Sequence, residues 1–492
     1  MPFTKAPETS TFKTQRFPVV GTPLQRNGAY VGSLPDQRFL NCYPEKINSE
    51  TLKTNSFYLR KRPGLISQFI TNVAEGRGII YEDSTQKTFG VTGNIVWVWD
   101  GTTLTNIGTL ATSTGAVGWT VHLTTGIDVA LLDGVNGYLI NPNTNVFTQI
   151  TDVNFPSPHV PDPVSMDGYL FVAKAGTADI YNSNLNVPTV WTPGDFITAE
   201  MYPDFIVALS KNNNYIYAVG TGSVEFFYDA GIATGSPLQR NDSAVLQFGT
   251  PAPGSVTQTE KEVIMIGSTQ NGGRTIWLIE GFKATEIALE PVKMSLDAEG
   301  AAISTCNCYC IRTAGHKFYV LRLEQSKRTW VYDFEEKLWH EWSGYADDGS
   351  TPALFRGAFC SDSTIGHPFM QDTSNGRIYS MSEDVYQDNG VQILVQMTTE
   401  KQDFDNMNRK DYYRFVLFGD WPNNVTTSNI TLDWTDDDYR TYQGNRTINL
   451  CQALPVTRRL GKSRRRAFRL TYTDNQPLRL EGFEVDVNIG GT

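Results

Sequence analysis

This chain of 492 residues has few charged residues, an excess of acids, and almost no runs of the strong helix formers Ala, Glu, Leu and Lys. Charged residues make up 19% of the sequence, below the roughly 25% that is typical of soluble proteins. The formal net charge is -11. Non-specific DNA binding needs excess Lys and Arg to neutralise phosphates, so this balance argues against a general affinity for nucleic acid. An acidic surface can still lie beside DNA without holding it.

Long apolar runs are also missing. No segment approaches the roughly 18 consecutive apolar residues of a membrane-spanning helix, and MPFTKAPETSTFK at the N-terminus has no apolar core of signal-peptide length. We therefore expect a soluble protein made in the cytoplasm, with no membrane insertion.

Cysteines are too few for a disulfide framework in a chain of this length, since there are only six. Cys306, Cys308 and Cys310 have strand spacing, so their side chains share one face. Metal binding with His316 is conceivable, but structural zinc favours cysteine pairs on turns. We expect buried free thiols, no metal and no cofactor, and find no functional role for the three cysteines.

The composition that remains is that of a β protein, with 42 Gly, 24 Pro and 12% aromatic residues. Similar hairpins recur along it. Each has an alternating apolar strand, a turn with Asp, Asn or Glu near Gly or Pro, and a second short strand. Examples are IVWVWDGTTLTNIGT (95–109), GYLINPNTNVFTQIT (137–151), ADIYNSNLNVPTVWT (178–192), TIWLIEGFKATEIAL (275–289) and RTWVYDFEEKLWHEW (328–342).

The hairpins recur roughly every 40 to 50 residues, the spacing of four-stranded propeller blades. The sequence therefore predicts an all-β fold with a six- or seven-bladed β-propeller. A weaker unit at 354–384 is either a further blade or a unit that an N-terminal strand completes. The other candidate blades are 66–112, 115–152, 160–200, 203–248, 254–292 and 300–345.

The aromatic residues of 328–342 have two interpretations. In a propeller, Trp330, Trp339 and Trp342 would pack between neighbouring sheets, where large aromatic area contributes most. Exposed at a blade mouth, they would instead form a platform for a ligand. We favour the packing interpretation.

The flanks differ from the middle. Residues 1–65 are rich in Pro, Gly and Asn and predict an extended N-terminal arm, followed by the propeller at 66–387. Residues 388–492 return to long alternating strands, which predict a separate C-terminal β-sandwich-like domain at a ring or channel.

No catalytic constellation is visible. The sequence has no G-x-S-x-G, H-E-x-x-H or EF-hand pattern, and no G-x-G-x-x-G after a strand. The acidic run Asp436, Asp437 and Asp438 is more typical of a solvated edge than of an acid/base pair. We therefore predict that the protein is not an enzyme.

One basic cluster, VTRRLGKSRRRAFRL (456–470), departs from the acidic background. Its cations could pair with acids of a neighbouring copy of the chain, since arginine makes bidentate contacts with carboxylates. They could instead contact DNA phosphates. We favour pairing between subunits. The candidate residues are Arg458, Arg459, Lys462, Arg464, Arg465, Arg466 and Arg469.

Several stretches, taken in order, resemble one family. QRFLNCYPE (37–45) and YLRKRPGL (58–65) are similar to the start of the tail nozzle proteins of short-tailed bacteriophages, also described as packaged-DNA stabilisation or head-completion proteins. The likeness continues through GSVEFFYDAG (222–231), GGRTIWLI (272–279), AGHKFYVL with TWVYDFEEKLWHEW, and the terminal LGKSRRRAFRLTYTDNQPLRLEGFEVDV.

The resemblance implies a homohexameric nozzle below the portal and the head-to-tail adaptor protein. Such a ring would close the DNA exit channel, retain the packaged genome and conduct double-stranded DNA during ejection without sequence specificity. It would belong to the virion tail, be assembled in the host cytoplasm, and contact a tail fibre or tailspike, with a tail needle as a further candidate partner. The alternative is a carbohydrate-binding β-propeller of a phage or bacterial surface.

Overall fold

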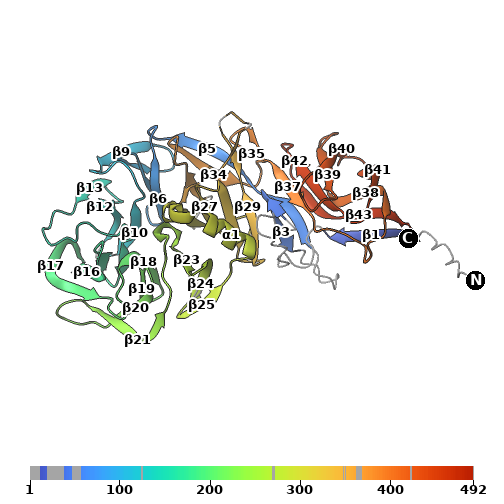
Figure 1. Ribbon diagram of the computed structural model, residues 1–492. Coiled ribbons are helices and arrows are strands. Elements are labelled where there is room, and N and C mark those ends of the chain that lie inside the picture. Colours follow the sequence, from blue (N-terminus) through green and yellow to red (C-terminus); the bar gives the residue numbers. More distant parts are fainter. Residues whose placement is uncertain are drawn as a thin grey trace, which may run out of the picture.

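The computed structural model describes residues 11–18, 38–46, 57–123, 126–268, 272–346, 348–349, 351–361, 368–421 and 424–490. Over these residues the chain forms a large β-propeller and a smaller β-sandwich, which lie side by side in Figure 1. The helical segments in this part of the chain are the helix α1 (Glu290–Ala298) and the short 3-10 turns η1 (Pro253–Ser255) and η2 (Gly300–Thr305). No helix among the described residues is long and apolar enough to cross a membrane.

Five blades are independent four-stranded antiparallel sheets, each formed by consecutive strands. They follow the repeating hairpins of the sequence. Blade one is β6 (Gly76–Glu82), β7 (Lys87–Thr92), β8 (Ile95–Trp99) and β9 (Leu104–Thr109); blade two is β10 (Gly118–Leu123), β11 (Ile127–Leu132), β12 (Gly137–Asn141) and β13 (Val146–Gln149); blade three is β14 (Val164–Met166), β15 (Tyr169–Ala173), β16 (Asp179–Asn184) and β17 (Val187–Thr198); blade four is β18 (Ile206–Asn212), β19 (Tyr215–Gly220), β20 (Val224–Asp229) and β21 (Leu238–Leu246); blade five is β22 (Thr257–Gln258), β23 (Glu262–Ser268), β24 (Arg274–Glu280) and β25 (Lys283–Glu286).

Blade six is also formed by consecutive strands, but its sheet continues into strands of the sandwich, and blade seven includes a strand from a distant part of the chain. Blade six contains β26 (Asn307–Thr313), β27 (His316–Leu323), β28 (Arg328–Asp333) and β29 (Leu338–Trp342). Blade seven contains β32 (Phe359–Cys360), β33 (Phe369–Gln371), β34 (Arg377–Ser382) and, as its outer strand, β5 (Gly64–Ile70) from near the N-terminus. The weak unit at 354–384 is therefore a seventh blade that an N-terminal strand completes.

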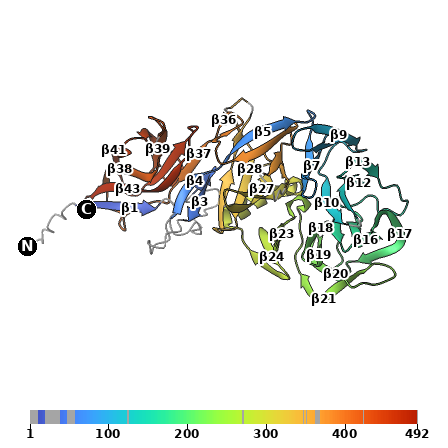
Figure 2. The same cartoon turned by 180° about the vertical axis from the view of Figure 1, so that it is seen from behind.

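The seven blades close into a ring. The first strand of each blade contacts the first strand of the next, and β32 of blade seven contacts β6 of blade one. The view from behind shows the same closed arrangement (Figure 2). The six- or seven-bladed prediction is thus confirmed with seven blades.

Acidic turns in the hairpins have a simple physical cause. In the β28–β29 hairpin the Asp333 carboxylate accepts hydrogen bonds from the backbone N–H groups of Glu335 and Glu336, at 2.9 and 3.4 Å. Lys337 then takes a positive φ of 56° and reverses the chain. An aspartate that bonds its own backbone two or three residues on stabilises a tight turn. Asp100 and Asp133 do the same in blades one and two.

Aromatic side chains of blade six fill the spaces between blades. Trp330 and Trp339 pack in one buried cluster with Ile264 and Ile276 of blade five. Trp342 packs on the opposite face with Met370 and other residues of blade seven. All three indoles are buried, so the packing interpretation is confirmed and they form no exposed platform.

Cys306, Cys308 and Cys310 pack against the same cluster between blades five and six. None of the three forms a disulfide, and burial raises the pKa of Cys306 to about 12. No group of three or more potential ligands able to hold a metal ion occurs among the described residues.

The sandwich has two sheets that enclose a single core. One contains β3 (Cys42–Lys46), β4 (Phe57–Lys61), β43 (Arg479–Ile489), β38 (Lys410–Asp420) and β41 (Val456–Ser463), with β1 (Thr11–Pro18) paired to β43. The other contains β2 (Arg38–Leu40), β37 (Val395–Thr398), β42 (Ala467–Tyr472), β39 (Asn429–Thr435) and β40 (Gln443–Asn449). Phe415 and Phe483 from the first sheet meet Phe468 from the second.

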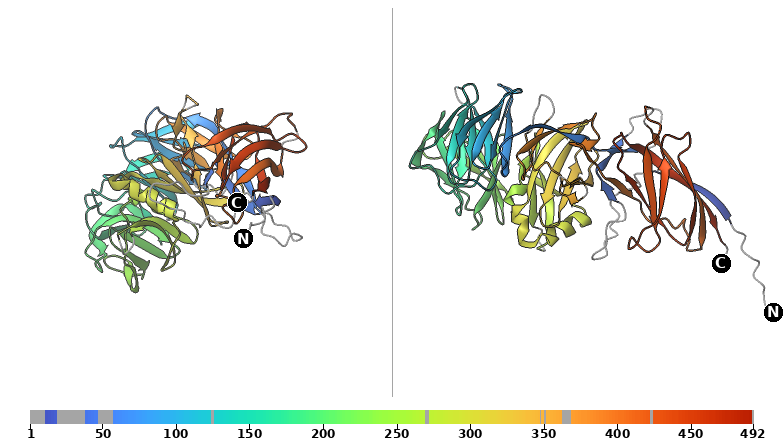
Figure 3. Two further views of the ribbon diagram at one scale, coloured as in Figure 1. Left: turned by 45° about the vertical axis from the view of Figure 1, so that its right-hand side comes forward. Right: turned by 90° about the horizontal axis from the view of Figure 1, so that it is seen from above.

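Strands from the predicted arm, 1–65, are thus integral to the sandwich, and β5 begins inside that range. The remaining residues of the arm, 1–10, 19–37 and 47–56, lie outside the described residues. Figure 3 shows the molecule as elongated, with β1 and the end of β43 at the sandwich end, away from the propeller. The short strands β30 (Gly344–Tyr345) and β31 (Pro352–Ala353) lie in the connection between blades six and seven, and β35 (Gln387–Asp388) and β36 (Val391–Gln392) lie in the connection from the propeller to the sandwich.

Candidate functional site: the domain junction and the arginine-rich edge

The propeller and the sandwich are joined by one continuous sheet. Strand β2 lies between β29, the outer strand of blade six, and β37 of the sandwich. It pairs in parallel with β29 at Leu40 and Glu341, and antiparallel with β37 from Arg38 to Leu40. Arg38 also forms a bidentate ion pair with Glu341, at 3.0 and 2.9 Å. Backbone hydrogen bonds therefore cross from one domain to the other without interruption.

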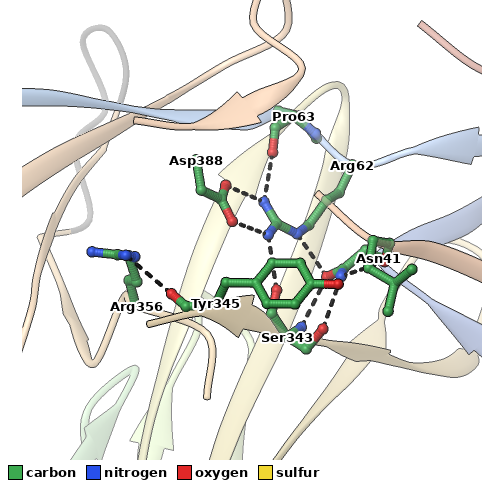
Figure 4. Close-up of polar contacts among 8 residues, drawn as sticks. Asn41, Arg62, Pro63, Ser343, Tyr345, Arg356 and Asp388 are labelled. Carbon is green, nitrogen blue, oxygen red and sulfur yellow. Dashed lines mark hydrogen bonds and ion pairs between the residues drawn. The ribbon is translucent and has the colours of Figure 1, made fainter. Parts of the chain in front are cut away.

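Arg62 lies at the centre of this junction, and its side chain is completely buried. Its guanidinium donates to both carboxylate oxygens of Asp388, at 2.9 and 2.5 Å. It also donates to the carbonyls of Pro63 and Ser343 and to Oδ1 of Asn41, at distances from 2.9 to 3.0 Å (Figure 4). A buried charge of this kind is stable only when it is paired and hydrogen-bonded.

Asn41 completes the network. Its φ of 55° lies in the left-handed region, which asparagine tolerates better than most residues. Its Nδ2 donates to Oγ of Ser343 and to the carbonyl of Leu394, at 2.9 and 2.7 Å, while Oδ1 also accepts from the Ser343 N–H at 2.8 Å. The network therefore connects four segments that are distant in the sequence. Three of them precede β3, β5 and β37, and the fourth follows β29.

A second buried cation, Lys61, lies next to Arg62. Burial, assisted by the charge of Arg62, lowers the pKa of Lys61 to about 7. Its ammonium donates to the Asp474 carbonyl at 2.8 Å and lies 5.3 Å from the ring centre of Tyr472. The junction therefore holds, next to Arg62, a second basic group whose charged form is disfavoured by burial.

The arginine-rich edge occupies β41, the following turn and β42. Four of its seven candidates find acids inside the same chain. Lys462 pairs with Asp411 at 3.1 Å, Arg465 with Asp438, and Arg469 with Asp433 at 3.0 Å. Arg466 is 1% exposed and holds Asp436 in a bidentate pair at 2.7 and 2.8 Å.

Arg466 is a structural residue of the sandwich. Its guanidinium carbon lies 4.3 Å from the ring centre of Tyr412 and 5.0 Å from that of Trp434, and Nη1 donates to the Leu460 carbonyl. Cation–π contacts of this kind are strongest where water is excluded. The charge of Arg466 is paired and most of its N–H donors are already hydrogen-bonded, so this side chain is not available to bind DNA or another subunit.

The three aspartates of the acidic run 436–438 have different partners. Asp436 and Asp438 are the partners of Arg466 and Arg465, as described above. Asp437 instead accepts from the Thr441 hydroxyl at 2.6 Å, the Thr441 N–H at 2.9 Å and the Thr435 hydroxyl at 2.8 Å. These hydrogen bonds, that of the Thr441 hydroxyl foremost, lower the pKa of Asp437 to about 2. The acids of this run are therefore mostly paired with groups of the same chain and do not form a free solvated edge.

Three cations have no acid partner among the described residues. Arg458, Arg459 and Arg464 are exposed, and Arg464 donates to the Met407 carbonyl at 2.7 Å. Arg458 and Arg459 form no ion pair with any residue that the structure describes. Arg459 has a positive φ of 62° at an irregularity in the β38–β41 pairing. These three residues are the cations of the edge whose charge is not paired with an acid in the part of the chain that the structure describes.

Comparison with known proteins identifies the fold family. A family model described as "Bacteriophage P22 Gp10, beta-propeller", of the phage stabilisation type, matches residues 16–386. The chain belongs to this P22 Gp10 family. The match includes all seven blades, β2 and Arg62, and ends just before Asp388. The resemblance to phage tail nozzle and stabilisation proteins is therefore confirmed, and the P22 Gp10 family is a family of structural phage proteins.

Other comparisons add little to the family match. No curated protein sequence matches the chain. Similar solved structures include the β-propeller domain of Myceliophteria thermophila Cps50 (Swd1), 9% identical with a TM-score of 0.41, covering 65% of this chain and 100% of that one. A chain of the Mitotic Checkpoint Complex is 8% identical with a TM-score of 0.38, covering 68% of this chain and 97% of that one. Neither carries functional information about this P22 Gp10 family member.

Proposed function

We propose that this protein is the nozzle subunit of a short-tailed phage. Six copies form a ring below the portal and the head-to-tail adaptor protein. The ring closes the DNA exit channel, retains the packaged genome and conducts double-stranded DNA during ejection. The observation that carries the proposal is the family match over 16–386.

The domain junction supports this role. A ring that holds pressurised DNA needs subunits whose domains keep a fixed relative position. The continuous β29–β2–β37 pairing and the buried Arg62–Asp388 pair provide such a connection. Side-chain networks that are fully satisfied in a low-dielectric interior are rigid.

Charge distribution also fits a conduit. The chain carries a net charge of -11, and four of the seven cations in its most basic segment are neutralised internally. A surface without excess cations does not retain phosphates, because retention depends on counterion release by Lys and Arg. DNA can therefore pass such a ring without sequence preference.

Arg458, Arg459 and Arg464 are our candidates for contacts between subunits. Replacing all three with Gln should leave the fold intact and weaken ring assembly, since each exposed pair contributes about 0.2–1 kcal/mol. Analytical ultracentrifugation should show the change from monomer to hexamer at a roughly tenfold higher protein concentration for three such pairs. A Lys261→Gln, Lys283→Gln, Lys337→Gln variant, which loses three exposed cations of the propeller, controls for the loss of charge alone.

Two other outcomes have clear meanings. If the triple variant assembles normally but its DNA retention depends less on salt, the three arginines contact phosphate instead. If neither property changes, the arginine-rich edge has no role in either contact. A wild-type protein that remains monomeric at every concentration, and shows no six-fold ring in electron micrographs, contradicts the hexameric nozzle itself.

A further inference from the structure

Exposed apolar side chains gather at the outer strands of blades three and four, which lie at the end of the propeller away from the sandwich (Figure 1). Phe196 on β17, and Met201 and Phe205 in the segment between β17 and β18, are 39%, 39% and 57% exposed. Neither β17 nor β21 pairs with a further strand among the described residues, whereas β2 and β35 pair with the outer strands of blades six and seven. An open outer strand beside exposed apolar residues is a surface that another chain can cover.

The same end of the molecule carries most of its negative charge. Blades two to four, residues 118–246, contain twelve Asp and Glu but only three Lys and Arg, so they hold -9 of the net charge of -11. Arg240 pairs with Glu225 and Asp242. Asp195 and Glu200 form no ion pair in the part of the chain that the structure describes.

These acids lie beside the apolar residues. Asp195 precedes Phe196 on β17, and Glu200 precedes Met201. Burial raises the pKa of Tyr169 in blade three, and the nearby carboxylates of Asp229 and Asp195 raise it further, so acids of blades three and four lie near one ring. We call the surface formed by Asp195, Phe196, Glu200, Met201 and Phe205 the acidic-apolar patch.

The arginine-rich edge of the sandwich has the opposite charge and a similar apolar part. Arg464 donates to the carbonyl of Met407, whose side chain is exposed. Tyr413, also exposed, lies on β38 at the same irregularity of the β38–β41 pairing as Arg459. Two surfaces that combine apolar area with opposite charges are complementary, because apolar contact supplies binding free energy and charge selects the partner and its register.

We propose that the arginine-rich edge of one subunit docks on the acidic-apolar patch of the next subunit. This inference rests on the ring of the proposed function. The two surfaces lie at opposite ends of an elongated subunit (Figure 3), so the contact runs head to tail. Head-to-tail contacts close into rings when the rotation between neighbours allows it. The negative charge of the patch disfavours DNA as its occupant.

Exchange of charge between the two surfaces tests the contact. The edge variant carries Arg458→Glu, Arg459→Glu and Arg464→Glu, and the patch variant carries Asp195→Lys and Glu200→Lys. Each variant alone places like charges at every contact. Each should therefore need a protein concentration at least roughly tenfold higher for the change from monomer to hexamer, measured by analytical ultracentrifugation.

An equimolar mixture of the edge and patch variants should restore the ring. Reversed edges then meet reversed patches, and native patches of the edge variant meet native edges of the patch variant. Native mass spectrometry should show hexamers with three copies of each variant. Phe205→Ser should also weaken assembly of the otherwise unchanged chain, whereas Val73→Ser, at a side chain that is 79% exposed between β5 and β6, should not.

The outcomes separate this contact from the nozzle assignment. If the wild type forms hexamers but the mixture does not, or if the patch variant assembles like the wild type, the head-to-tail contact is wrong and the ring remains. A wild type that forms no ring overturns both. A restored ring also shows that both variants are folded, since the mixture contains no other protein.

Discussion

Replacing Asp388 with alanine is expected to lower the free energy of unfolding by about 3–5 kcal/mol, because it leaves the Arg62 charge buried without its partner. Arg62 is fully buried and makes two of its hydrogen bonds to Asp388. Urea unfolding followed by tryptophan fluorescence and far-UV circular dichroism measures the loss. The unfolding transition should occur at a lower urea concentration than in the wild type, because the substitution weakens the junction between the domains.

Two control variants separate the charge from the shape of the site. Arg62→Met combined with Asp388→Leu removes both charges and should recover most of the stability, since paired apolar substitutes for buried ion pairs are often neutral or stabilising. Glu383→Ala removes the carboxylate that pairs with Arg60 at 2.8 Å near the surface. This variant should lose no more than about 1 kcal/mol. An Asp388→Ala protein as stable as Glu383→Ala would contradict a buried ion pair at the junction.

Trp339→Ala should also cost about 3–5 kcal/mol, the usual result of deleting a buried large aromatic side chain. Trp339 fills the space between blades five and six, and its Nε1 donates to the Ile287 carbonyl at 2.7 Å. The variant should therefore give less soluble protein and unfold at lower urea concentration. Val153→Ala, at a side chain that is 94% exposed, should change stability by less than about 0.5 kcal/mol. Normal stability of Trp339→Ala with loss of glycan binding would instead support a carbohydrate-binding platform.

Local patterns were sufficient to predict most of the propeller. Blades one to six are built from consecutive strands, so each hairpin carries its own alternation and its own turn residue, such as Asp333. Blade seven is different, because Ser380 on β34 pairs with Ile66 on β5 across most of the chain. No local pattern distinguishes a strand that closes a distant blade from one that pairs with its neighbour.

The same dependence on pairing between distant strands explains why the strands of residues 1–65 were not predicted. Strand β1 pairs with β43 along its whole length, from Thr11 with Ile489 to Pro18 with Gly482. In the sequence these two strands are separated by the entire propeller. The Pro- and Gly-rich character of 1–65 indicates irregular connections, but it does not show that the strands between them join the sandwich.

The candidate residues show what charge patterns can and cannot predict. The arginine-rich edge and the acidic run 436–438 were both visible, but their pairing with each other depends on the β39–β42 register, in which Asp433 faces Arg469. Arg62 was not predicted as a site residue, because RKRPG contains three adjacent cations and nothing local marks which one is buried. Its partner Asp388 follows Glu383 and Asp384 closely in the sequence, so nothing local marks that acid either, and only the fold brings it to Arg62.

The most direct test of the nozzle assignment adds the purified chain to DNA-filled, tailless phage particles that carry portal and adaptor. Particle-bound protein is measured after sedimentation, and leaked genome is measured as nuclease-sensitive DNA. The account predicts saturable binding of six copies per particle and a marked reduction in leaked DNA. Binding should be lost when the adaptor is absent. Particles that bind none of the chain and leak as much DNA with it as without it would contradict the assignment.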